Sequence, residues 1–140
     1  TIESSGIAPA LMAAAKMNVP LVILKKQPSK TLHNDLYQTQ VTSFTTEKSY
    51  ELTLSRDVIS EDDNILLIDD FMKAGGTIRG MMSLLNEFEA NLAGVGVLME
   101  AEGAEKKMVS EDVSLMKLTN VDPDEGLVTI SRGNVEHFLK

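Results

Sequence analysis

The sequence has 140 residues, no cysteine and a formal net charge of −8. A chain of this length suits one compact domain that can bury a core without disulfides, and the lack of cysteine excludes thiolate metal sites and cysteine nucleophiles. The lysines and arginines are scattered, whereas nucleic acid binding needs clustered cations, so we expect no direct contact with nucleic acid. No apolar run is long enough to span a membrane, so we expect a cytoplasmic protein without a membrane partner.

The first residues predict a helix followed by a buried strand. Residues 6–17, GIAPALMAAAKM, have helical apolar spacing, and Pro9 falls in the first turn, where proline is tolerated. Residues 19–26, VPLVILKK, form a continuous aliphatic run that is typical of a parallel strand buried on both faces. The opening Thr1-Ile2 has the character of a strand tail. We therefore expect one domain over residues 1–140 that lacks its N-terminal part.

The middle of the chain is polar before it turns apolar again. Residues 27–47 are rich in Thr and Ser and predict a long loop or an irregular hairpin arm, which at this length is functional or disordered. Residues 49–55 alternate in polarity, as a half-exposed strand does, and residues 58–64 predict a turn.

The second half alternates strands with helices. We predict a helix at 75–90, whose apolar residues follow a 3.6-residue period, and a short helix at 103–111. Strands are predicted at 64–70, 92–100, 114–121 and 127–133. This order predicts an α/β fold with a mostly parallel sheet flanked by helices.

One stretch, ILLIDDFMKAGGT at 65–77, suggests chemistry. Asp69 and Asp70 end a buried strand, and in open α/β sheets ligands bind beyond the carboxyl ends of the strands. The following helix start offers unpaired amides, and glycines let an anion approach closely. The phosphate-binding candidates are Lys73, Ala74, Gly75, Gly76 and Thr77. Carboxylates beside a phosphate pocket make sense if they hold sugar hydroxyls or water around Mg²⁺.

A plainer interpretation is open as well. The aspartates could solvate a strand end while the glycines make a tight turn, and spacing alone favours neither interpretation. No Gly-Lys-Ser/Thr follows, so the stretch is not a Walker loop.

The same stretch resembles the phosphoribosyl pyrophosphate (PRPP) motif of type I phosphoribosyltransferases. TIESSGIAPALMAA at 1–14 resembles the pyrophosphate loop and helix of bacterial xanthine phosphoribosyltransferases, and residues 25–45 resemble their long flexible loop. Residues 69–103 are more similar to the effector domain of the Gram-positive purine-operon repressor, which shares the fold and binds PRPP as a signal.

The resemblance implies residue assignments and partners. Asp69 and Asp70 would be the catalytic pair, and pyrophosphate would bind at Ser4, Ser5, Gly6 and Lys26. Lys30 and Thr31 would belong to the flexible loop. Mg²⁺ would arrive with PRPP and have no direct protein ligand, with Glu3 acting on it through water. The remaining partners would be a purine base and a second copy of the chain in a homodimer. For Ser4 and Ser5, plain helix capping is the alternative.

Two functions remain open. The first is a purine (xanthine-like) phosphoribosyltransferase of purine salvage, which transfers ribose 5-phosphate from PRPP to the base and releases pyrophosphate. The second is a non-catalytic PRPP-sensing domain, favoured by the repressor-like loop 73–77 and by Ala101, which stands after Glu100 where the xanthine enzymes have a purine-contacting lysine. A structural domain without a ligand would leave both loops unexplained. The accepted base is not predicted.

Overall fold

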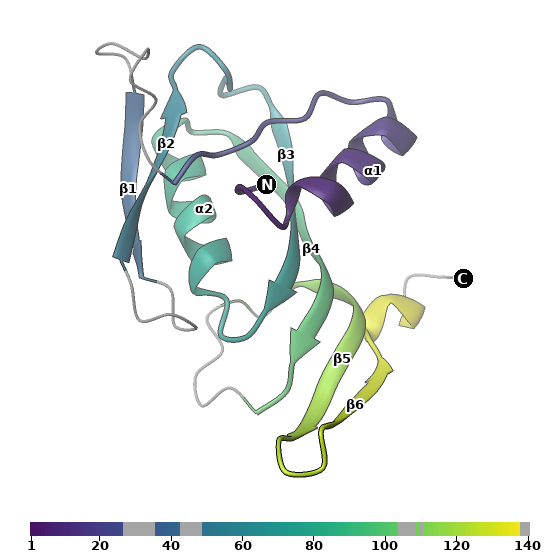
Figure 1. Cartoon of the computed structure of the whole chain (residues 1–140). Coiled ribbons are helices and arrows are strands. Elements are labelled where there is room, and N and C mark those ends of the chain that lie inside the picture. Colours follow the sequence, from purple (N-terminus) through teal and green to yellow (C-terminus); the bar gives the residue numbers. More distant parts are fainter. Residues whose placement is uncertain (27–35, 43–48, 104–108, 110, 138–140) are drawn as a thin grey trace.

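The computed structural model describes residues 1–26, 36–42, 49–103, 109 and 111–137 (Figure 1). Its elements are α1 (Ile7–Met17), β1 (Leu36–Thr42), β2 (Ser49–Ser55), β3 (Asn64–Met72), α2 (Gly76–Glu87), β4 (Asn91–Ala101), β5 (Val113–Asp122), β6 (Leu127–Arg132) and the 3₁₀ helix η1 (Asn134–His137). No helix within these ranges is both long and apolar enough to cross a membrane.

The main sheet has the strand order β3-β4-β5-β6. The pairs β3–β4 and β4–β5 are parallel, whereas β5 and β6 form an antiparallel hairpin. A separate two-stranded sheet is formed by β1 and β2, which pair antiparallel. The predicted α/β fold with a mostly parallel central sheet is confirmed.

The two long helices cover opposite faces of β3 (Figure 1). Leu67, Val95 and Val97 are buried in one core cluster with Ile78, Met81, Leu84 and Leu85 of α2. Their strand neighbours Leu66 and Ile68 instead line a mostly apolar groove of about 490 Å³ together with Ala10 and Ala14 of α1. Alternation of side chains along the strand accounts for this division.

The prediction of a regular, fully buried strand at 19–26 is wrong. Pairing in this segment is limited to single bridges, from Leu24 to Ile2 in parallel and from Lys25 to Thr53 in antiparallel. Two features account for this: Pro20 has no amide to donate, and the partner segment turns away after Glu3. Val19 and Ile23 are 48% and 37% exposed, so the aliphatic run is not buried on both faces.

The other predicted strands and the helix at 75–90 hold in type within the described residues. The expected hairpin arm is formed by β1 and β2, while residues 27–35 and 43–48 lie outside the described residues. The strand β2 is more buried than its alternation predicts, because Leu52, Thr53 and Leu54 are all at most 7% exposed. Most of the predicted helix 103–111 also lies outside the described residues.

Candidate functional site

The candidate site lies where the chain leaves two strand ends for opposite faces of the sheet. The segment Thr1–Glu3 runs parallel to Leu24 and leads into α1, whereas β3 leads into α2 on the other face. In open α/β sheets this reversal opens a crevice beyond the carboxyl ends of the strands, where ligands bind. The two predicted phosphate loops therefore lie at the same edge of the molecule.

The loop before α2 has the backbone of an anion-binding turn. Gly75 is the N-cap of α2 at a φ of 83°, a conformation that favours glycine. No side chain caps this helix, and its first turn holds no acidic residue. The amides of Gly76 and Thr77 therefore begin a positive helix end without a carboxylate of their own. Lys73 is exposed beside them.

The loop before α1 also leads into an uncapped helix start, although the φ of its N-cap is −68°, in the right-handed region. Its N-cap is Gly6, again without a side-chain cap, so plain capping by Ser4 or Ser5 is not what the structure shows. Both serines are exposed. The Lys26 amide donates a hydrogen bond of 2.7 Å to Glu3 Oε1, which fixes Lys26 beside this loop. The structure thus brings together the residues predicted to bind pyrophosphate.

The two aspartates differ in their surroundings. We expected both to face a ligand at the strand end, but β3 continues to Met72, so Asp69 and Asp70 alternate between faces. Asp69 is only 4% exposed, whereas Asp70 is half-buried. Asp69 Oδ1 accepts a hydrogen bond of 2.9 Å from the Asp70 amide. Burial raises the pKa of Asp69 to about 7, an effect that this hydrogen bond partly offsets.

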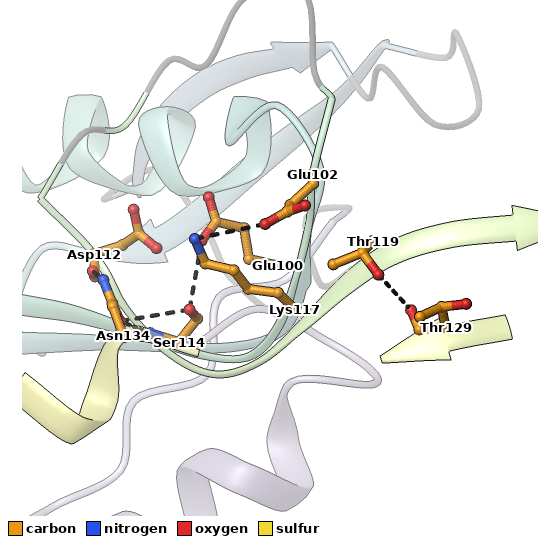
Figure 2. A network of polar contacts seen from close by, with 8 residues as sticks. All are labelled: Glu100, Glu102, Asp112, Ser114, Lys117, Thr119, Thr129 and Asn134. Carbon is orange, nitrogen blue, oxygen red and sulfur yellow. Dashed lines mark hydrogen bonds and ion pairs between the residues drawn. The ribbon is translucent and has the colours of Figure 1, made fainter. Parts of the chain in front are cut away.

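A polar network next to this edge was not predicted (Figure 2). The Asn134 side chain donates to the Asp112 carbonyl oxygen and accepts from the Ser114 amide, both at 2.7 Å. Ser114 Oγ donates to Glu100 Oε2 at 3.4 Å, and Glu100 is opposite Met72 in the β3–β4 register. The partners of Asn134 are 20 and 22 residues away in the sequence, so a local sequence pattern could not predict this network.

The network continues at the surface. Lys117 Nζ lies 4.0 Å from Glu102 Oε1, and Figure 2 shows the side chains of Glu100, Glu102 and Lys117 converging on one region. Glu100 lies at the end of β4, between Met72 of β3 and Lys117 of β5 in the sheet register, so these groups lie at the same sheet edge as the end of β3. Ala101, the position that departs from the xanthine enzymes, is half-buried between the two glutamates in sequence.

The structure does not test the flexible-loop residues or the metal. Lys30 and Thr31 lie outside the described residues. Within the ranges that the structure describes, no three histidine, cysteine, aspartate or glutamate side chains gather as a metal site.

The fold therefore places two uncapped helix starts, those of α1 and α2, at one edge of an α/β sheet, with Asp70 near the end of β3. The chain matches the phosphoribosyl transferase domain over residues 1–128, and it belongs to that family. Its fold is the type I phosphoribosyltransferase fold. Adenine phosphoribosyltransferase from Giardia lamblia, crystallised with 9-deazaadenine, aligns with a TM-score of 0.73 at 21% identity, over 85% of this chain and 68% of that one.

Two curated relatives are similar in sequence. A xanthine phosphoribosyltransferase of Agathobacter rectalis is 82% identical over 100 residues, which are 71% of this chain and 52% of that protein. The purine biosynthesis transcriptional repressor PurR of Bacillus subtilis is 40% identical over 140 residues, which are all of this chain and 49% of the repressor. The chain therefore spans about half the length of these two relatives.

Proposed function

We propose that the protein is a purine phosphoribosyltransferase that transfers ribose 5-phosphate from PRPP to a xanthine-like base. The observation that carries the proposal is the pair of uncapped helix starts at Gly6 and Gly75. The two helices lie on opposite faces of the sheet, and Asp70 lies near the end of the strand that leads to Gly75. Two separated anion sites flanking a carboxylate match PRPP, which has a phosphate at one end, a pyrophosphate at the other and hydroxyls between. The xanthine-like base rests on the 82% identical relative.

In this reaction the bond from the ribose C1 to pyrophosphate breaks and a bond from C1 to a ring nitrogen of the base forms. The base loses the proton of that nitrogen, and pyrophosphate leaves. We propose that the amides at 76–77 hold the 5-phosphate while Asp70 accepts hydrogen bonds from the ribose hydroxyls. Positive charge develops on the ribose as in glycoside hydrolysis, so a nearby carboxylate stabilises it. Lys26 and the amides after Ser4 stabilise the leaving pyrophosphate.

Mg²⁺ is proposed to enter with PRPP. When bound, it would neutralise charge on the pyrophosphate. We propose that Glu3 holds water molecules bound to this Mg²⁺, because Glu3 precedes the pyrophosphate loop. The Lys26 amide donates a hydrogen bond of 2.7 Å to Glu3 Oε1 and so fixes this side chain. From the family resemblance we also propose that Lys30 and Thr31 close over the ligand. We further propose that the protein is a cytoplasmic homodimer and that this segment does not bind nucleic acid.

A PRPP-sensing domain without catalysis is the second candidate. It is favoured by the match to the repressor across the whole chain, and by Ala101 in place of a purine-contacting lysine. The same residues would bind PRPP, but no base would react.

Turnover separates the two functions. The protein is mixed with Mg²⁺, PRPP and xanthine, guanine, hypoxanthine or adenine in turn, and pyrophosphate release is measured. The enzyme predicts release with at least one base, and most with xanthine, and loss of release in Asp70→Asn. Saturable PRPP binding with no release for any base would replace the enzyme with the sensor.

A further inference from the structure

Asp69 lies against the loop before α1. A Cβ atom added at Gly6 would be 2.7 Å from Asp69 Oδ1 and closer still to Thr1 Oγ1, so no residue but glycine fits without displacing them. The same Asp69 oxygen accepts the Asp70 amide at 2.9 Å. Asp69 therefore lies between β3 and the start of α1.

The contact places a buried carboxyl group beside a helix start. Gly6 is the N-cap of α1, whose first turn contains no acidic residue. The Asp69 carboxyl group therefore lies beside a helix start that has no acidic residue of its own. Thr1 Oγ1 is buried without a hydrogen-bond partner in the part of the chain that the structure describes, and it lies against the same Gly6 position. Asp69 and the Thr1 hydroxyl thus both lie next to the start of α1.

We propose that the two aspartates have separate functions, with Asp70 binding the ribose hydroxyls and Asp69 acting as a positioning residue for the pyrophosphate loop Ser4–Gly6. Asp69 acts through Gly6, because its 4% exposure leaves little surface for a ligand. The identities of the ligands rest on the proposed function. The division differs from the sequence-based expectation, in which the aspartates form one sugar-binding pair.

The division predicts that the two halves of PRPP respond differently to substitution. Ribose 5-phosphate contacts Asp70 and the loop 73–77, which do not depend on the position of Gly6. Pyrophosphate contacts the loop 4–6, whose position depends on Asp69. Removing the Asp69 carboxylate should therefore weaken pyrophosphate binding selectively.

Isothermal titration with Mg-pyrophosphate and with ribose 5-phosphate tests this. Loss of a charged hydrogen-bonding group corresponds to about a tenfold or greater loss of affinity, so we expect that loss for pyrophosphate in Asp69→Ala, with ribose 5-phosphate changed less than about threefold. Asp69→Asn, which keeps an acceptor for the Asp70 amide, should recover much of the pyrophosphate affinity. Asp70→Ala should show the reverse pattern, with ribose 5-phosphate affected most.

Gly6→Ala gives an independent comparison if Asp69→Ala does not fold, since it displaces the same contact from the other side. It should also weaken pyrophosphate selectively. Equal loss of ribose 5-phosphate affinity in the Asp69 and Asp70 variants, or unchanged pyrophosphate affinity in both Asp69→Ala and Gly6→Ala, would overturn the division. If the unsubstituted chain binds neither ligand, the proposed function is overturned together with it. Normal binding without turnover overturns catalysis alone.

Discussion

Val109 packs directly on Gly75, so that a Cβ added to this glycine would lie 3.0 Å from Val109 Cγ2. Met72 Sδ approaches the same position to 3.5 Å. Gly75 is therefore constrained twice, by its φ of 83° and by its neighbours. The turn that leads into α2 depends on both constraints.

We predict that Gly75→Ala weakens ribose 5-phosphate binding and destabilises the fold. A left-handed backbone costs a non-glycine residue about 1–2 kcal/mol, and the contact with Val109 adds to it. The shifted turn would move the amides of α2 away from the phosphate. Calorimetry for binding and urea unfolding for stability measure the two effects.

Gly126→Ala is the matched control. Gly126 has a φ of 65°, but a Cβ there would meet nothing within 4 Å, and the residue lies in the β5–β6 turn. It should lose stability through the backbone alone and bind ribose 5-phosphate normally. Equal binding losses in the two variants would contradict a specific function of the Gly75 turn.

A second prediction concerns Asn134, whose side chain joins the start of β5 to η1. Asn134→Ala removes hydrogen bonds to the Ser114 amide and the Asp112 carbonyl, and we expect a loss of about 1–3 kcal/mol in unfolding free energy. Asn120→Ala, at an exposed position on β5, is the control and should change stability little. Urea unfolding of both proteins compares them, and similar losses would show that the network does not stabilise the fold.

Gly133 predicts a steric effect at the same place. A Cβ there would lie 2.8 Å from the Leu115 carbonyl carbon and nearer still to the Ser114 carbonyl group. Gly133→Ala must shift the backbone of β6 or β5, with an expected cost of about 1–3 kcal/mol. Thermal unfolding measures this loss of stability. An unchanged midpoint would show that the backbone of β5 and β6 moves apart without a cost in stability.

Asp69 predicts a dependence of stability on pH. Burial raises its pKa from 3.8 to about 7, so between these values the folded state binds more protons than the unfolded state. The stabilisation is therefore complete below about pH 4 and is lost as pH rises through 7. A shift from 3.8 to about 7 corresponds to an upper value of about 4 kcal/mol. The carboxylate of Asp70 is a charged group that acts on Asp69 and raises its pKa further.

Asp69→Asn should flatten this profile and be more stable than the unsubstituted protein at pH 8. Asp62→Asn, at an exposed position, should leave the profile unchanged. Urea unfolding from pH 5 to pH 8.5 measures all three proteins. A profile that Asp69→Asn does not alter would show that Asp69 is ionised throughout this range.

The sequence predicted what depends on local pattern. The aliphatic run before Asp69 and the 3.6-residue period after Gly75 suffice for β3 and α2, because each element is buried along a continuous stretch of chain. The glycine turn between them was likewise recognisable, since its backbone geometry requires glycine at Gly75.

What failed depends on partners distant in the sequence. The run at 19–26 has the composition of a buried strand, but a strand needs paired neighbours, and Leu24 meets only a single bridge from Ile2. The burial of Asp69 could not be predicted, because the loop at Gly6 that lies against it is far away in the sequence. The network at Asn134 is hidden for the same reason.

A crystal structure of the protein with PRPP and Mg²⁺ tests the central claim most directly. The account predicts the 5-phosphate within about 3 Å of the Gly76 and Thr77 amides, the pyrophosphate on the loop Ser4–Gly6, and the ribose hydroxyls on Asp70. Electron density for PRPP at another place on the molecule, or an empty crevice at a saturating PRPP concentration, would contradict it.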